Sequence, residues 1–271
     1  MHEECLGLWR QLYVMRPHRF RLELALSLYN LGLGFQLSSP GDRDNGIGAA
    51  ACIEAAGLCL AESSAGADRE RYILLRLLPS LGNLLDGLGR DQEAQLVRAE
   101  YVRLRREAPS EESADSRAEL AHELLGLARN LRTLKHDSEA SAPLAEAIAL
   151  YRGLLTDSNR RFGPEDRLGL ADSLSCLGDP AAAGSRPGEA EESYREAVLQ
   201  YRAIPGVEPS ADAEPAEGSP RRTGQQESLE RAGRFGAAVA LVNLAAVLDR
   251  LGRPDEASSA RQAAGTYQGG D

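Results

Sequence analysis

A short ladder of apolar residues occurs five times in this 271-residue chain. In each copy an anchor leucine is preceded by a leucine at −3, by Ala or Leu at −6 and −7, and is followed directly by Gly or Ala. The anchors are Leu31, Leu81, Leu127, Leu177 and Leu244. Spacings of three, six and seven place these residues on one side of an α-helix. The ladder therefore predicts a helix, here named helix A, whose small residue lets a neighbouring helix approach closely.

A second pattern follows the ladder in four of the copies. Thirteen residues after the anchor each copy has an alanine that follows a glutamate, and another apolar or aromatic residue comes seven positions later. These alanines are Ala94, Ala140, Ala190 and Ala257. Turn sequences such as "LGRDQEA" and "LGRPDEA" lie between the two patterns, and Gly89 and Gly252 suit the end of a helix. The pattern predicts a second helix, helix B, so the repeating unit is a helix–turn–helix.

The spacing of the anchors indicates an array with one insertion. Residues 204–227 are rich in Pro, Ser and acidic residues, which predicts a disordered segment. Without its central 22 residues, the last anchor spacing falls close to the others. "WRQLYVMRPHRF" from Trp9 also resembles "YRGLLTDSNRRF" from Tyr151, so we expect the chain to open inside a helix B. We expect a half repeat and four helix pairs over 1–203, the insertion over 204–227, and a final pair over 228–268.

These units resemble tetratricopeptide repeats (TPRs). The first half of the motif is matched by Leu28, Leu31, Gly32 and Phe35. The whole motif is matched by Leu124, Leu127, Ala128, Ala140, Leu144 and Ala147, and again by Leu174, Leu177, Gly178, Ala190, Tyr194 and Ala197. The long period is similar to that of TPR arrays in kinesin light chains and microbial signalling ATPases. The resemblance implies an all-α, right-handed superhelical solenoid of antiparallel helix pairs, which binds a peptide or helix of a partner protein in its concave groove.

The same resemblance implies which side chains line that groove. They lie at offsets −5, −2, +2, +5 and +6 from each anchor, and the candidates are Leu26, Tyr29, Leu33, Gln36, Arg76, Asn83, Asp86, His122, Arg129 and Arg132. We expect Arg76, Asn83 and the arginines of the third repeat to hold carboxylates of an acidic peptide, because arginine donates in a fixed fork. The alternative is that these residues are solvated or form ion pairs within the chain. Asp172 and Asp179 predict an acidic continuation of the groove in the fourth repeat.

A chaperone-tail clamp is matched only in part. Asn83 and Arg129 occupy two of the five positions of the carboxylate clamp found in chaperone-binding relatives. Tyr29, Leu33 and Leu125 stand where that clamp has lysine or asparagine, so the resemblance does not extend to this ligand. Leu8, Trp9 and Leu12 at the start of the chain are either a docking face or the edge of a longer array.

Charge and composition favour some functions and disfavour others. The net charge of −10 opposes binding to nucleic acids or to anionic membranes. An RNA-binding helical array, suggested only by the arginines, is therefore a weaker alternative, as is a sensor segment of a larger signalling protein. The N-terminus does not resemble a signal peptide, no apolar run nears 20 residues, and four cysteines make no disulfide framework, so we expect a cytoplasmic protein with reduced thiols.

Enzyme signatures are absent from the sequence. "PSLG" around Ser80 lacks the first glycine of a nucleophile elbow, and the only lysine, Lys135, is not part of a phosphate-binding glycine loop. His122 has no second histidine four residues later, as a zinc motif would need, and Asp42 and Asp44 begin a calcium loop that is not completed. We therefore expect no enzymatic activity, no cofactor and no metal.

Overall fold

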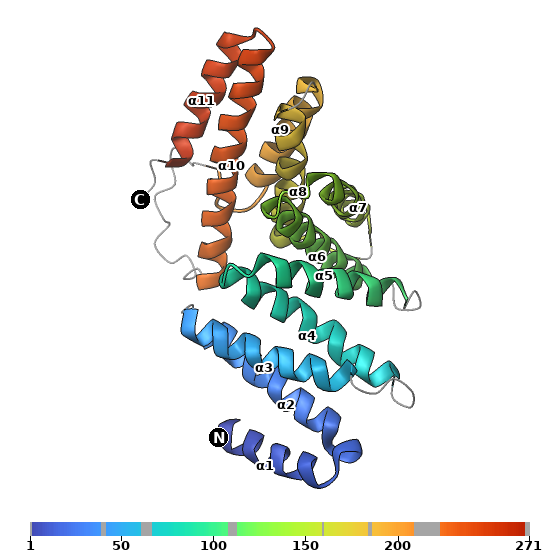
Figure 1. Cartoon of the computed structure of the whole chain (residues 1–271). Helices are drawn as coiled ribbons and strands as arrows, with labels where there is room; N and C mark the ends of the chain where they lie inside the picture. Colours follow the sequence, from blue (N-terminus) through green and yellow to red (C-terminus); the bar gives the residue numbers. More distant parts are fainter. Residues whose placement is uncertain are drawn as a thin grey trace. The chain divides into compact units, whose positions relative to one another are not determined.

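The structure, a computed structural model, describes residues 2–38, 42–60, 67–107, 113–158, 160–183, 186–208 and 223–268, which contain eleven helices and no strand. The helices are α1 His2–Met15, α2 Pro17–Ser38, α3 Asp42–Leu60, α4 Ala67–Gly87, α5 Asp91–Arg106, α6 Ala114–Thr133, α7 Asp137–Leu155, α8 Pro164–Ala183, α9 Pro187–Arg202, α10 Gly224–Arg250 and α11 Pro254–Gln268 (Figure 1). The expected all-α fold of paired helices is confirmed. The even-numbered helices carry the anchor leucines and are helices A, while α1 and the other odd-numbered helices are helices B.

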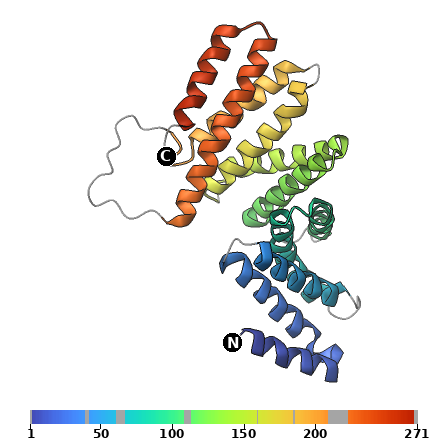
Figure 2. The same ribbon diagram turned by 60° about the vertical axis from the view of Figure 1, so that its left-hand side comes forward.

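The first compact unit comprises residues Met1–Glu112 and Gly126–His136, and so contains helices α1 to α5. Each of these helices packs against the next one along the chain, and α2 also contacts α4 (Figures 1 and 2). The ladders face the interior: Leu24 and Leu28 on α2, and Leu78 and Leu81 on α4, are all buried. The apolar stripe that the sequence repeats is therefore the surface that neighbouring helices cover.

The second compact unit comprises residues Ser113–Leu125 and Asp137–Asp271, and so contains helices α7 to α11. Sequential helices again pack against each other, and α8 contacts α10 as α2 contacts α4. Leu170 and Leu174 on α8, and Leu241 and Leu244 on α10, are buried. The same ladder thus builds the core of both units.

Helix A ends in the same way in three repeats, with a residue of positive φ eight positions after the anchor. These residues are Gly89 (φ 66°), Lys135 (φ 65°) and Gly252 (φ 73°). The amide that follows each of them donates to the carbonyl five residues back, as from Arg90 to Leu85 at 2.9 Å and from His136 to Leu131 at 2.8 Å. This is the Schellman motif, in which the left-handed residue is usually glycine. The third repeat therefore places a lysine in a conformation that favours glycine.

Two helix-breaking signals in the sequence do not end their helices. In the fourth repeat the sequence "DPAAAGS" from Asp179 predicts the loss of the last turns of helix A, but α8 continues through Ala183. In the second repeat Pro79 predicts a kink in helix A, but α4 runs past it to Gly87 although Pro79 has no amide to donate. Around Pro79 the buried Leu77, Leu78 and Leu81 sustain α4, because their burial outweighs one missing hydrogen bond.

The predicted insertion over 204–227 is described at its two ends, while residues 209–222 lie outside the described residues. Ile204 and Val207 are buried, with 1% and 0% of their surfaces exposed, and Val207 lies close to Gly233 of α10. At the other end Thr223 caps α10, since its hydroxyl accepts from the Gln226 amide and the Gln226 side chain accepts from the Thr223 amide. The final helix A thus begins at Gly224, within the segment assigned to the insertion.

Helix α10 is long and apolar enough to cross a membrane when judged by length and composition alone. The sequence analysis found no apolar run of that length, so this helix is a correction to it. Half of the apolar window is buried inside the protein, including Ala237, Leu241 and Leu244. The core helix of a helical array meets the same criterion, so its composition is explained by packing within the second unit.

Ion pairs connect helices B that are neighbours but not consecutive. Arg10 on α1 pairs with Glu54 on α3 at 2.6 Å, and Arg152 on α7 pairs with Glu196 on α9 at 2.5 Å. Arg10 and Arg152 occupy equivalent positions in the two similar segments that begin at Trp9 and at Tyr151. The similarity of these segments therefore reflects an ion pair between helices B that recurs in both units.

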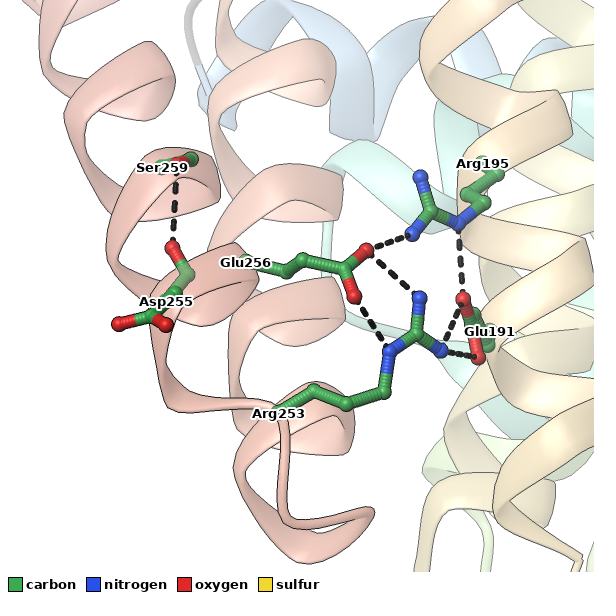
Figure 3. Close-up of polar contacts among 6 residues, drawn as sticks. All are labelled: Glu191, Arg195, Arg253, Asp255, Glu256 and Ser259. Carbon is green, nitrogen blue, oxygen red and sulfur yellow. Dashed lines mark hydrogen bonds and ion pairs between the residues drawn. The ribbon is translucent and has the colours of Figure 1, made fainter.

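A larger cluster connects α9 to the start of α11 (Figure 3). Arg253 donates to both oxygens of Glu191, at 2.9 and 2.8 Å, and its Nε lies 2.6 Å from a Glu256 oxygen. Arg195 bridges the same two carboxylates, at 2.9 Å from Glu191 and 3.1 Å from Glu256. Hydrogen bonds from Arg253 and then Arg195 lower the pKa of Glu256. Two arginines and two glutamates thus alternate in a closed, solvent-exposed network.

The strained lysine gives a first prediction. We expect Lys135→Gly to raise the free energy of unfolding by up to about 1 kcal/mol, because glycine adopts positive φ without a Cβ clash. Urea denaturation followed by circular dichroism would measure it. Gly89→Ala is the matched control at the equivalent position and should lower the stability by a similar amount, and a Lys135→Gly protein less stable than the parent would contradict the argument.

The network in Figure 3 gives a second prediction. The pKa of Glu256 is lower in the folded protein than in the unfolded chain. The hydrogen bonds of its carboxylate therefore stabilise the folded state fully above the ordinary glutamate pKa of about 4.3. This stabilisation is lost as pH falls through the lower folded pKa. The melting temperature of Glu256→Gln should therefore lie slightly below the parent value at pH 7 and approach it below about pH 4. A difference that grows on acidification would be the opposite of this expectation.

Candidate functional site

Large side chains of helix B lie across the small residue that follows two of the anchors. In the fourth repeat, a Cβ added at Gly178 would lie 2.8 Å from the ring of Tyr194. In the second repeat, a Cβ at Gly82 would lie 3.1 Å from Cζ of Arg98. Tyr194 and Arg98 both stand seventeen residues after their anchors, where the TPR motif has an aromatic or large apolar residue. Helix A must therefore have a small residue here for helix B to approach.

The side chains of helix B also cross the helix A of the following repeat. A Cβ at Gly169 would lie 2.2 Å from the hydroxyl of Tyr151, and one at Gly236 would lie 2.4 Å from the ring of Tyr201. Arg98 also crosses the next helix A, but at a different position: a Cβ at Gly126 on α6 would lie 2.6 Å from its Cζ. One arginine thus passes between Gly82 of its own repeat and Gly126 of the next.

Arg98 is the centre of the most highly connected polar cluster that the described part of the first unit contains. It is 2% exposed, and its Nε donates to Asn130 at 3.2 Å. Its Nη2 donates to Asp86 at 2.5 Å and to Asn83 at 3.1 Å. Asn130 in turn donates to Asp86 at 2.8 Å. A buried guanidinium needs a paired charge and satisfied donors, and this set supplies both.

Two predicted groove residues are therefore engaged from within the protein. Asn83 and Asp86 are exposed on α4, yet their side-chain oxygens accept hydrogen bonds from Arg98. Arg98 is not among the residues predicted from the sequence, because the predicted site lies on helix A whereas Arg98 lies on helix B. The sequence does contain one signal for Arg98. It is a charged residue at the position where Leu144 and Tyr194 stand in other repeats.

Arg76 is placed differently from Arg98. It is exposed on α4, its guanidinium lies 5.8 Å from the ring centre of Tyr72, and it donates to the Tyr72 hydroxyl at 3.3 Å. Hydrogen bonds to Tyr72 first, and also to Tyr29 of α2, raise its pKa. No carboxylate of a described residue lies within ion-pair distance of it. Arg76 is thus a fixed, permanently charged group held by tyrosines and open to solvent.

The remaining predicted site residues lie at several levels of exposure. Tyr29 is buried, Leu33 and Arg132 are half-buried, and His122 and Arg129 are exposed; the side chain of Gln36 lies outside the described residues. Arg129 and Arg132 belong to the same unit as Arg76, whereas His122 belongs to the second unit. The structure thus brings Tyr29 together with Arg76, and Asn83 together with Asp86.

The two acidic residues predicted in the fourth repeat also have internal partners. Asp172 accepts from the hydroxyl of Tyr201 at 2.5 Å, and Asp179 accepts from the hydroxyl of Tyr194 at 2.7 Å. Asn243 of α10 lies 3.5 Å from the same Asp179 oxygen. The tyrosines that cross the glycines of helix A therefore end on carboxylates of helix A, as Arg98 does in the second repeat.

Two cysteines, Cys52 and Cys59, are buried as small apolar core residues. They and the half-buried Cys176 are free thiols. Burial raises the pKa of Cys52 to about 12 and is the main cause that raises that of Cys59 to about 11. Such thiols are poor nucleophiles and poor metal ligands at neutral pH. No cluster of potential metal ligands occurs among the described residues.

Comparison with known proteins supports the fold alone. No protein-family model matches the chain, and no curated protein matches it. Among solved structures, the crystal structure of BtubC (BKLC) from P. vanneervenii is similar, with a TM-score of 0.59 and 16% sequence identity over 98% of this chain and 88% of that chain. That neighbour is a helical repeat protein. The likeness is therefore one of helical repeat architecture.

The glycine crossing gives a third prediction. We expect Gly126→Ala to lower the free energy of unfolding by about 1–3 kcal/mol, because the new methyl group overlaps a buried guanidinium that three partners hold in place. Gly153→Ala on α7 is the matched control, since a Cβ there meets no atom within 4 Å. It should stabilise by up to about 1 kcal/mol through helix propensity. Equal effects of the two substitutions, measured by urea denaturation, would show that Arg98 moves aside freely.

Proposed function

We propose that this chain is a protein-interaction scaffold, and that the exposed surface of its helices A in the first unit holds an acidic segment of a partner protein. The helical repeat fold supports a scaffold in general. Arg76 supports the acidic partner in particular, because it is an exposed cation without a carboxylate partner among the described residues.

The physical reason is that a ligand carboxylate can bind Arg76 without breaking an existing ion pair. Breaking an existing ion pair would oppose binding, as it would at Arg98, which already pairs with Asp86. Arg76 instead exchanges solvent for a ligand carboxylate while it keeps its contacts with Tyr72. Its guanidinium is charged at every physiological pH, as in any arginine, and the hydrogen bonds to the tyrosines raise its pKa further. A guanidinium held over a ring has also lost part of its rotamer entropy before binding.

Other parts of the same unit contribute to this function in the proposal. Arg129 and Arg132 lie on the part of α6 that belongs to the first unit, and they add positive charge to a protein whose net charge is −10. Leu33 and Tyr72 supply apolar and aromatic surface on α2 and α4. The proposed ligand is therefore a peptide or helix that carries carboxylates beside apolar side chains.

This function is tested with an array of 12-residue peptides rich in Asp and Glu, and with matched peptides in which Asn and Gln replace the acids. We expect the purified chain to prefer acidic peptides at low salt, and Arg76→Ala to weaken that binding about 5- to 20-fold, the usual loss for one charge-assisted contact. Fluorescence anisotropy of labelled peptides would give the dissociation constants.

The control is Arg103→Ala on α5, which removes the same charge from an exposed residue that pairs with Glu100 and Glu107. We expect less than a twofold change for it. If Arg76→Ala and Arg103→Ala weaken the peptides equally, the effect is one of overall charge. If no acidic peptide is preferred over its amide counterpart, the acidic-partner proposal is wrong.

A further inference from the structure

A cavity of about 410 Å³ lies between α1, α2 and α3 in the first unit. Helices α1 and α3 both pack against α2, and the cavity is space that they leave between them. On α2 it is lined by Leu28 and the anchor Leu31. At 3.6 residues per turn, these leucines lie on the opposite side of α2 from the predicted groove positions Leu26, Tyr29 and Leu33. The cavity is therefore a different surface from the one that the proposed function uses.

The walls of the cavity are mainly apolar. Leu6 of α1, Leu28 of α2 and Ala51 of α3 are buried beside it. Ile47 and Ala50 of α3 also line it and are exposed to solvent. The volume falls in the usual range of small-molecule sites, about 300–1,000 Å³. An apolar lining holds water poorly and favours an apolar ligand.

An ion pair closes one end of the cavity. Arg10 of α1 donates through Nη2 to Oε2 of Glu54 on α3 at 2.6 Å, and both residues line the cavity. The other nitrogens of Arg10 and Oε1 of Glu54 have no partner among the described residues. This end thus offers donors and an acceptor side by side, while the two charges neutralise each other. Because the pair bridges α1 and α3, a peptide or helix could not lie along the space between them without breaking it.

The second unit contains the same ion pair with a different lining. Arg152 and Glu196 form the equivalent pair between α7 and α9. The positions four and seven residues before the paired glutamate hold Ala50 and Ile47 in the first unit, and Glu192 and Glu189 in the second. The repeat therefore packs as well with acidic residues at these positions, and the fold does not require apolar ones. The apolar lining is a property of the cavity in the first unit.

We propose that this cavity binds one neutral small molecule that has an apolar body and a single hydroxyl head. The body is about 10 Å long, the rise of the seven residues from Ile47 to Glu54. A hydroxyl both donates and accepts, so it bonds Arg10 and Oε1 of Glu54 together without breaking their ion pair. A ligand carboxylate would compete with Glu54 for Arg10, which disfavours a negatively charged ligand.

The probe is 2-naphthol, whose two fused rings and one hydroxyl match the proposed ligand, and equilibrium dialysis against the full chain measures its binding. Naphthalene lacks the hydroxyl, and 2-naphthoate carries a carboxylate in its place. We expect 2-naphthol to bind about 3- to 10-fold more tightly than naphthalene, the usual effect of one neutral hydrogen bond. We expect 2-naphthoate to bind more weakly than 2-naphthol, because its carboxylate is repelled by Glu54.

Two substitutions test the apolar walls. Ala50→Leu fills part of the cavity and should weaken the binding of 2-naphthol at least about tenfold. Ile47→Glu introduces the residue type of the second unit and should have a similar effect. Both residues are exposed, so melting curves that match the parent would show that lost binding is not lost folding. Ala145→Leu, the same change at an exposed alanine of α7, is the matched control and should change the affinity less than twofold.

A third substitution tests the ion pair. Glu54→Gln removes the charge that competes for Arg10, so 2-naphthoate should gain about 5- to 20-fold in affinity and become the preferred ligand. Glu196→Gln, the equivalent change in the second unit, should leave the order of the three ligands unchanged.

Three results would overturn the proposal. They are the absence of saturable 2-naphthol binding, equal affinities of 2-naphthol and naphthalene, and equal effects of Ala50→Leu and Ala145→Leu. Arg76→Ala should leave 2-naphthol binding unchanged, because the cavity does not include that residue. A loss of binding in Arg76→Ala would instead place the ligand at the acidic-peptide surface.

Discussion

The close approach of helices at the small residues of helix A is the constraint on which this structure depends. Where Gly82, Gly126, Gly178 or Gly236 stands, a side chain of helix B crosses the backbone, and a single methyl group would overlap it. Cores of this kind are held by shape rather than by large apolar volume, which suits a chain with only 5% aromatic residues. The ladders bury leucine and alanine around these crossings, and each helix is covered only when its neighbours are present.

The crossings also determine the chemistry of the helix A surface. A side chain long enough to pass a glycine delivers its polar end to the far side of helix A. Tyr194 and Tyr201 bring hydroxyls to Asp179 and Asp172, and Arg98 brings a guanidinium to Asp86. These polar residues of helix A resemble ligand contacts, but they already accept hydrogen bonds from side chains of helix B. Arg76 differs because it lies on helix A itself, where its guanidinium packs over the ring of Tyr72 on the same helix.

The sequence predicted the architecture well because helical periodicity reports directly which residues are buried. The ladders, the pairing and the glycine turns at Gly89 and Gly252 follow from local patterns. Arg98 was missed because its burial depends on glycines in two other helices, which no local pattern reveals. The burial of Val207 likewise depends on tertiary packing that overrides turn signals. The peptide-binding role of the groove positions stays a prediction, although their polar partners are now visible.

The proposed surface on the first unit combines two kinds of contact, and they respond differently to salt. Binding at Arg76 rests on a charge pair near solvent, so it weakens as salt rises. Burial of a partner's apolar side chains against Leu33 and Tyr72 is largely unchanged by salt. Each contact alone is modest, but a partner that carries both elements on one flexible segment gains the effective concentration of the second site once the first is occupied. Such a partner would show a salt-sensitive and a salt-resistant component of affinity, each removable by its own substitution.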